Sequence, residues 1–196
     1  MIDKNNMINF FNKCASSWDA DTIKDEKITT TIFDNGGIRP GVAVLDVACG
    51  TGVLFPDYLS RNVKSVTGVD ISPEMIRIAK GKFQDHRISI LCADIKTVEL
   101  GQHFDCCMVY NALPHFPDPQ NLIRVLASHL KPDGRLSVAH GMSRAALQRH
   151  HSGAASKVSI ELPSETELAQ MFAPYFDVDV MISDDKMYQV SGIKKL

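Results

Sequence analysis

The chain contains 196 residues, carries a net charge of −2 and is 44% hydrophobic. A chain of this length can bury a core without disulfides or metals, so we expect a single soluble domain spanning residues 1–196. The charge and the lack of any basic run argue against a nucleic-acid-binding surface, and no apolar stretch is long enough to span a membrane.

The cysteines and the N-terminus indicate a reducing compartment. The five cysteines form neither a C-x-x-C pair nor an even disulfide framework. The first six residues, Met-Ile-Asp-Lys-Asn-Asn, lack the apolar centre of a signal peptide. We therefore expect a cytoplasmic protein, and the sequence leaves open whether it is a monomer or a homodimer.

After a mostly helical pattern in residues 1–36, a predicted strand at Val42–Val47 leads into a glycine-bearing turn. Residues 44–52 read Val-Leu-Asp-Val-Ala-Cys-Gly-Thr-Gly. Gly50 and Gly52 have no Cβ, so the backbone can approach a ligand closely there. The N–H groups of the helix expected next can meet an anionic group. This pattern predicts a site for a nucleotide-like cofactor.

Two residues argue against a dinucleotide at this turn. The dinucleotide fingerprint needs a third small residue, and Phe55 occupies that position. Asp46, on the strand before the turn, would repel a pyrophosphate but suits a ligand with a cationic end. S-adenosylmethionine (SAM) has such an end in its amino and sulfonium groups, together with a carboxylate for the helix N-terminus.

Further along the chain, predicted helices and strands alternate. The helix starts are marked by Ser72-Pro73, by Asp118-Pro119 and by the capping box Ser164-x-x-Glu167. The later strands are expected at Val63–Val69, Ile88–Cys92, Phe104–Tyr110, Arg135–Ala139, Phe176–Ile182 and Met187–Ile193. This alternation predicts an α/β fold in which helices cover both faces of a parallel sheet.

Four segments follow the turn in a fixed order: Thr67–Ser72, Cys92–Ile95, Phe104–Pro119 and Leu130–Leu136. Together with the turn, they resemble the motifs of the class I SAM-dependent methyltransferases of the small-molecule type, with a distant similarity to the quinone-biosynthesis enzymes. The resemblance covers residues 40–140. It implies a Rossmann-like, seven-stranded, mostly parallel sheet with a final antiparallel strand. One departure is Ala48, where the family more often has glycine.

The resemblance also implies how the cofactor is held. Asp70 would accept the ribose hydroxyls at the end of the second strand, and Asp94 would meet the adenine amino group. The expected cofactor-binding residues are Trp18, Asp46, Ala48, Gly50, Thr51, Gly52, Asp70, Ile71, Met75, Ala93, Asp94, Ile95 and Asn111.

Two regions outside the SAM-binding core are expected to hold the substrate. Residues 1–36, which include Trp18, are similar to the segment that folds over the cofactor as a lid in many small-molecule methyltransferases. The alternative is a helix merely packed on the sheet. Residues 141–163 are long for an ordinary connection and follow a strand end, where ligands of such sheets bind. Residues 164–196 complete the domain with a helix and a hairpin.

The candidate catalytic residues are histidines at strand ends. A neutral hydroxyl, amine or thiol acceptor must lose a proton, and histidine can take it. The candidate bases are His115 and His140, and the other substrate-side candidates are Arg144, His150 and His151. Each has a structural alternative: an exposed or hydrogen-bonded histidine, or an arginine paired with a surface acid. We expect no resident metal.

The expected function is methyl transfer from SAM to a small molecule, with release of S-adenosylhomocysteine. Asn111 begins the segment Asn-Ala-Leu-Pro-His-Phe, which lacks the Asn/Asp-Pro-Pro-aromatic pattern of amide and adenine N-methyltransferases. This difference argues against nucleic-acid and protein-glutamine acceptors, and the acceptor atom (O, N, S or C) stays open. Two alternatives remain: a SAM-binding protein that transfers an aminopropyl group or acts as a sensor, and a metal- or metallocofactor-handling protein.

Overall fold

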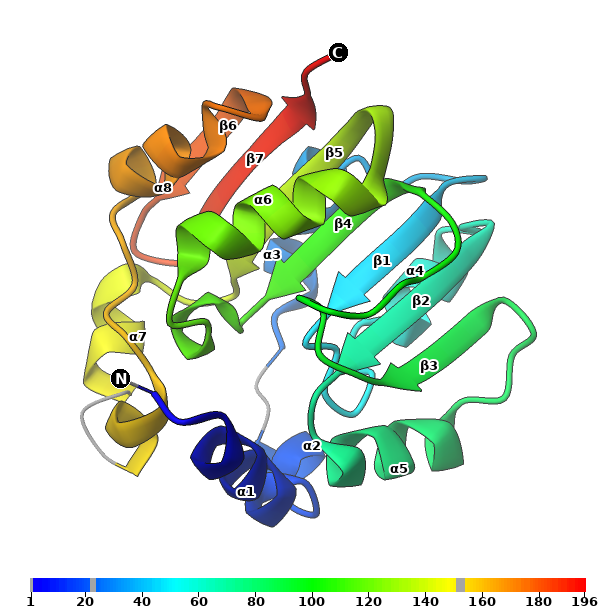
Figure 1. The fold of residues 1–196 in the computed structure, drawn as a ribbon, viewed down its shortest axis with the longest axis vertical. Helices are drawn as coiled ribbons and strands as arrows, with labels where there is room; N and C mark the ends of the chain where they lie inside the picture. Colours follow the sequence, from blue (N-terminus) through cyan, green and yellow to red (C-terminus); the bar gives the residue numbers. More distant parts are fainter. Residues whose placement is uncertain (1, 22–23, 151–153) are drawn as a thin grey trace.

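The computed structural model describes residues 2–21, 24–150 and 154–196. Within them, seven strands form one sheet in the order β3-β2-β1-β4-β5-β7-β6 (Figure 1). Neighbouring strands from β3 to β5 are parallel, whereas β7 is antiparallel to both β5 and β6. The strand bounds are β1 Ala43–Val47, β2 Ser65–Asp70, β3 Ile88–Cys92, β4 Phe104–Tyr110, β5 Leu130–His140, β6 Phe176–Ser183 and β7 Tyr188–Lys194. The predicted Rossmann-like α/β fold is confirmed.

Helices cover both faces of the sheet, and each face has its own apolar core. One core includes side chains of α6 and α8, and the other includes side chains of α3, α4 and α5. Figure 1 shows α6 and α8 in front of the sheet and α3 and α4 behind it. The helix bounds are α1 Lys4–Cys14, α2 Trp18–Asp21, α3 Glu26–Asn35, α4 Phe55–Ser60, α5 Pro73–Lys82, η1 Leu113–His115, α6 Pro119–His129, α7 Arg144–His150, η2 Ala154–Val158 and α8 Glu165–Phe172.

The predicted helix starts are all present, because each capping side chain satisfies a backbone N–H. Ser72 accepts from the N–H of Met75 at 3.2 Å, and Asp118 caps α6. Ser164 and Glu167 form the reciprocal capping box of α8.

The fifth strand is longer than the expected Arg135–Ala139. Leu130 already pairs with Phe104, and after a register shift Arg135 pairs with Cys106. The intervening turn, with Asp133 at a φ of 59°, therefore interrupts one long strand instead of preceding a short one. The difference arises because the strand pairing begins before the turn, which local turn residues do not reveal.

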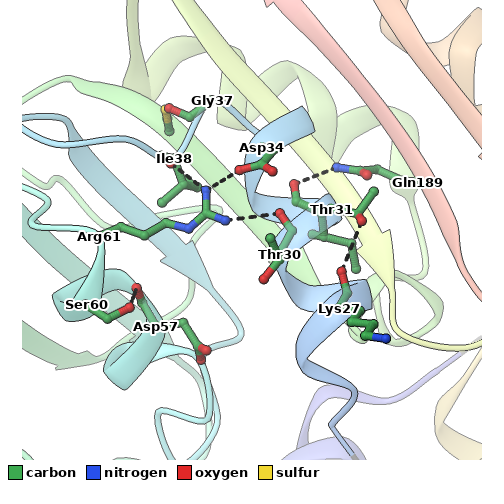
Figure 2. A network of polar contacts seen from close by, with 12 residues as sticks. Lys27, Thr30, Thr31, Asp34, Gly37, Ile38, Asp57, Ser60, Arg61 and Gln189 are labelled. Carbon is green, nitrogen blue, oxygen red and sulfur yellow. Dashed lines mark hydrogen bonds and ion pairs between the residues drawn. The ribbon is translucent and has the colours of Figure 1, made fainter.

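Helix α3 joins the N-terminal segment to the sheet and is fastened by one arginine (Figure 2). Arg61 donates to the Asp34 carboxylate at 2.5 Å and to the carbonyl oxygens of Ile38 and Thr30 at 3.0 and 3.2 Å. On the other side, Gln189 of β7 donates to the Ile32 carbonyl oxygen at 3.0 Å. The end of α3 is thereby fixed to the fold.

The arrangement of strands leaves a crevice where the strand order reverses. Strand β1 has β2 on one side and β4 on the other, and ligands of open α/β sheets bind at the carboxyl ends of strands at such a point. Helices α1 and α2 lie across this edge of the sheet (Figure 1). Among the described residues, the helices fall short of the length and apolar character that crossing a membrane requires.

Candidate functional site

A cavity of about 260 Å³ occupies the carboxyl ends of the central strands. Its wall combines the N-terminal helices with the ends of β1, β2 and β4. Most of the expected cofactor-binding residues line it, namely Trp18, Ala48, Gly50, Asp70, Ile71, Met75, Ala93, Asp94, Ile95 and Asn111, and the candidate base His115 lines it too. Asp46, Thr51 and Gly52 are outside the lining.

The turn after β1 approaches the cavity through an uncommon backbone conformation. Ala48, Gly50 and Gly52 have φ values of 56°, 55° and 81°, in the left-handed region that glycine adopts without penalty. A β-carbon makes this region costly for Ala48, which gives a physical reason for the glycine that the family more often has there. Helix α4 begins only at Phe55. The turn itself, rather than the helix end expected from the sequence, therefore faces the cavity.

The large side chain of Phe55, at the third position of the glycine motif, packs against two glycines. A Cβ on Gly52 would lie 2.6 Å from the Phe55 ring, and so would a Cβ on Gly68 of β2. The aromatic ring therefore fills the space that these two glycines leave between the turn and β2. Gly52 accordingly serves packing beneath the turn.

Asp70 ties the turn to the next strand. Its carboxylate accepts from the Gly50 N–H at 2.9 Å and from the Ser72 N–H at 2.8 Å. Burial raises the pKa of Asp70, and these N–H donors counteract part of the rise. The carboxylate thus shapes the turn and also lines the cavity.

Asp46 is buried in β1, below the glycine-bearing turn, and is not part of the cavity wall. The residue is 2% exposed. Burial first, and then the negative charge of Asp70, raise the pKa of Asp46 well above its ordinary value. Direct contact with a cationic ligand end, as expected from the sequence, does not fit this position, because the side chain is outside the cavity lining.

The N-terminal segment, residues 2–21, makes a polar contact with each of three cofactor motifs. Lys4 donates to Asp94 at 2.8 Å, and Asn12 accepts from the Ser72 hydroxyl at 2.7 Å. Thr51 donates to Asp19 at 2.5 Å. Thr51 is outside the cavity lining, so it contacts the N-terminal segment and not the cavity. The segment is therefore bonded to the turn, to the end of β2 and to the end of β3.

Asp94 is the second carboxylate of the cavity. It accepts from Lys4 and, at 3.0 Å, from the backbone N–H of Lys96. Burial works to raise the pKa of Asp94, but the Lys4 and Lys96 contacts outweigh it and lower the pKa below its ordinary value. Asp94 therefore stays a hydrogen-bond acceptor.

At the end of β4, Asn111 and His115 turn toward the cavity. Asn111 adopts a φ of 53°, which asparagine tolerates better than most residues, and its side chain accepts from the Gly141 N–H at 2.9 Å. His115 on η1 places Nδ1 2.9 Å from the Val158 carbonyl oxygen. Its ring meets Phe11 of α1 edge to face, with centroids 4.8 Å apart.

Two of the other candidates, His140 and Arg144, lie away from the cavity lining. His140 is fully buried, with its ring centroid 6.0 Å from that of Tyr188. Arg144 donates to the Leu162 carbonyl oxygen at 2.9 Å and approaches Glu161 at 3.4 Å. His150 ends α7, and His151 lies outside the described residues. Of the expected cluster, His115 lines the cavity, whereas His140 and Arg144 are held elsewhere.

Several cavity residues escaped the sequence reasoning. They are Ile2, Lys4, Met7, Phe11, Val47, Cys49, Val53, Val69, Lys96, Tyr110, Ala112, Phe116 and Pro117. Three of them adjoin residues that the sequence did single out: Tyr110 precedes Asn111, and Phe116 and Pro117 follow His115. Proximity to those residues could have identified them. Lys4 and Met7 carry no motif of their own. Among the described residues, no three side chains of His, Cys, Asp or Glu are grouped to hold a metal ion.

Comparison with known proteins shows a similarity to methyltransferases over the central part of the chain. Residues 44–134 match the family described as methyltransferase domain. The chain is 28% identical over 175 residues to malonyl-[acyl-carrier protein] O-methyltransferase from Acetivibrio thermocellus, covering 88% of this chain and 62% of that protein. It is 38% identical over 99 residues to ubiquinone biosynthesis O-methyltransferase from Coxiella burnetii, covering 49% and 42%. The chain thus spans about half the length of these curated relatives.

Solved structures agree on the fold. A chain from the complex between the Haloferax volcanii Trm112 methyltransferase activator and a methyltransferase superposes with a TM-score of 0.81 at 17% identity, covering 95% of this chain and 98% of that one. N-methyltransferase NodS from Bradyrhizobium japonicum WM9, in complex with S-adenosyl-L-homocysteine, gives 0.73 at 16% identity, covering 96% and 98%. The motifs, the sheet order and the match over residues 44–134 agree: this chain has the fold of the class I SAM-dependent methyltransferases and resembles them across its central segment.

Proposed function

We propose that the protein transfers a methyl group from SAM to the oxygen of a small-molecule acceptor. The observation that carries the proposal is the cavity at the β1–β4 switch point, where Asp70, Asp94 and the positive-φ turn meet. The relatives matched by sequence are named O-methyltransferases, which supports oxygen as the acceptor atom. S-adenosylhomocysteine would be the second product.

The residues of the cavity fit SAM. Asp70 supplies acceptors for the ribose hydroxyls, and Asp94 supplies one for the adenine amino group. Apolar side chains of Ile71, Met75 and Ile95 line the same cavity and suit the faces of a flat base. We assign Gly50 and Ala48 to the amino-acid end of the cofactor, with Trp18 beside the turn, and Asp46, Thr51 and Gly52 to the support of the turn from behind.

His115 is the proposed proton acceptor. It is the one candidate base that lines the cavity in the described part of the chain, while His140 packs in the core. SAM supplies an already activated methyl group, so the protein's task is to position the acceptor and remove its proton. We assign no chemical role to Arg144, His150 or His151.

The N-terminal segment is proposed to act as a lid. Its polar contacts with Ser72, Thr51 and Asp94 hold it over the crevice, and Phe11 and Trp18 line the cavity from it. Excluding water strengthens electrostatic interactions with the cofactor and the acceptor.

The test begins with calorimetric titration of the protein with S-adenosylhomocysteine, with NADH as the control. We expect micromolar affinity for S-adenosylhomocysteine and no heat of binding with NADH. Incubation with SAM bearing a labelled methyl group and mixed small-molecule acceptors should then produce S-adenosylhomocysteine and a labelled product. Absence of S-adenosylhomocysteine binding by folded, ligand-free protein would contradict the assignment of the cavity.

A further inference from the structure

Ion pairs fasten the N-terminal segment near both of its ends. Lys4, near the start, pairs with Asp94 just beyond β3 at 2.8 Å. Asp19, near the other end, pairs with Lys82 at the end of α5 at 2.7 Å. Between them, Asn12 makes neutral hydrogen bonds to the start of α5. The closed position of the segment therefore depends on opposite charges at two separate points.

The Lys4–Asp94 pair is part of the cavity wall. Both residues line the cavity. Apolar side chains of the same segment, those of Met7, Phe11 and Trp18, line it as well. A ligand in the cavity is therefore covered by the segment on this side, and the ion pair closes the wall at the end where Asp94 is assigned to the adenine.

The two partners of this pair are held differently. Oδ1 of Asp94 accepts from the backbone N–H of Lys96 at 3.0 Å, while Oδ2 accepts from Lys4. The backbone bond keeps the carboxylate at the strand end, whereas the Lys4 side chain belongs to the segment and is 56% exposed. Opening of the wall therefore moves Lys4 away from Asp94, which remains available to the cofactor.

Both ion pairs are accessible to dissolved ions. In the second pair, the Lys82 and Asp19 side chains are 35% and 48% exposed. Exposed ion pairs contribute only modestly to stability, and salt screens the attraction between their charges. Pairs of this strength can hold the segment over the cavity and still let it open.

We propose that these two ion pairs act as a salt-sensitive latch, which sets how fast the cofactor and its product leave the cavity. The inference rests on the proposed function, because the cavity must hold SAM. It extends the proposed lid by assigning what keeps the lid closed, namely the opposite charges of the Lys4–Asp94 and Lys82–Asp19 pairs. Release requires both pairs to break, so the rate of release follows the strength of the pairs.

The release of S-adenosylhomocysteine tests the latch without a known acceptor. The protein is loaded with radiolabelled S-adenosylhomocysteine, and dissociation is followed after addition of an excess of the unlabelled compound. In Lys4→Met the side chain keeps its length but loses its charge, so we expect release about twofold to fivefold faster. Lys82→Met should act in the same direction.

Salt provides a second measurement on the same complex. Raising the sodium chloride concentration from about 50 to about 500 mM should speed release from the native protein by a factor similar to that of Lys4→Met. The Lys4→Met, Lys82→Met double variant should respond less to salt, because the charges that salt screens are already gone.

Two further substitutions in α1 serve as controls. Lys13→Met removes the same charge from an exposed position in the last turn of the helix, and the rate of release should stay close to that of the native protein. Lys4→Arg keeps the charge that faces Asp94, so it should keep both the native rate and its dependence on salt.

Unchanged or slower release from Lys4→Met would overturn the latch, and slower release would mean instead that Lys4 competes with the cofactor for Asp94. An equal effect of Lys13→Met would also overturn it, because the loss would then follow the net charge and not the ion pair. The proposed function fails separately, if the native protein does not bind S-adenosylhomocysteine at all.

Discussion

In the cofactor half of the cavity, defined by Asp70, Asp94 and residues 48–52, the functional groups are close to one another in the sheet. Each lies at or just beyond the carboxyl end of a parallel strand, and backbone N–H groups two residues further along hold the two carboxylates. In the acceptor half, defined by His115, Phe11 and Val158, the three residues come from η1, α1 and η2. The acceptor half is therefore assembled from segments outside the parallel sheet.

This difference matters because the two halves are held by different interactions. The cofactor half rests on strand pairing and on hydrogen bonds to carboxylates, such as Gly50 to Asp70 at 2.9 Å. The acceptor half rests on one ring contact and on two bonds between η1 and the segment at Val158–Ile160. A change in the second group should alter acceptor use while leaving cofactor binding nearly intact, as expected where function resides in segments added to a common fold.

The largest effect is expected from His115→Asn. Asparagine can still donate to the Val158 carbonyl oxygen but provides no basic nitrogen, so turnover should fall about 100-fold to 10,000-fold. Steady-state kinetics measure the loss.

The matched control is His86→Asn, since the His86 side chain is 93% exposed on the surface. It should keep native turnover. Affinity for S-adenosylhomocysteine should stay within about threefold in both variants. A large loss of cofactor affinity in His115→Asn would break the division of the cavity into two halves.

The next largest effect is expected from Asp70→Asn, which places an amide donor where Gly50 and Ser72 also donate. We expect affinity for S-adenosylhomocysteine to fall about 100-fold, since hydrogen bonds to charged groups contribute roughly 1.5–3 kcal/mol each. Calorimetry measures the loss, and Asp85→Asn, whose carboxylate pairs with Arg87 at the surface, is the control. Unchanged affinity would show that Asp70 does not hold the cofactor.

Asp70 also predicts how cofactor binding depends on pH. Burial raises the pKa of its carboxyl group, so the acceptor form is lost at a higher pH than for an ordinary aspartate. Affinity for S-adenosylhomocysteine in the native protein should therefore weaken on acidification before a typical carboxylate titrates. A flat affinity from neutral pH down to pH 4 would contradict this expectation.

A smaller effect is expected from Asn12→Ala. Asn12 accepts from the Ser72 hydroxyl at 2.7 Å and from the Glu74 N–H at 3.3 Å, which bonds α1 to the start of α5. Loss of both bonds should lower cofactor affinity about fivefold to tenfold, equivalent to roughly 1 kcal/mol, and speed proteolysis within residues 2–21. Asn5→Ala, at an exposed position of the same helix, should change neither quantity.

The sequence was sufficient for the sheet and for most of the cofactor half because the signals there are local. Capping residues, glycines at positive φ and apolar runs act within a few positions of themselves. The same reasoning did not distinguish His115 from His140, since both were expected at strand ends. Residue His140 pairs with Tyr188 of β7 and remains inside the sheet, and that pairing depends on a strand almost 50 positions away.

The acceptor half was less predictable for a related reason. The contact of His115 with Phe11 joins positions more than 100 residues apart, and the bond to Val158 joins positions 43 apart. Neither Lys4 nor Val158 belongs to a motif, so their places beside Asp94 and His115 follow only from the folded chain.

Asp46→Asn should give the smallest effect. It tests the buried residue that supports the cofactor half and does not line the cavity. The pKa of Asp46 is raised well above its ordinary value by burial and then by Asp70. The folded state therefore holds a proton that the unfolded state releases once the pH exceeds about 4, so this residue costs stability as the pH rises. Asparagine removes that cost, and the melting temperature at pH 8 should rise by about 2–4 °C, the shift that roughly 1 kcal/mol produces in a domain of this size. Thermal melts at pH 8 and pH 4.5 should show the gain shrinking at the lower pH; a loss of stability at pH 8 would mean that Asp46 is ionised and held by partners in the fold.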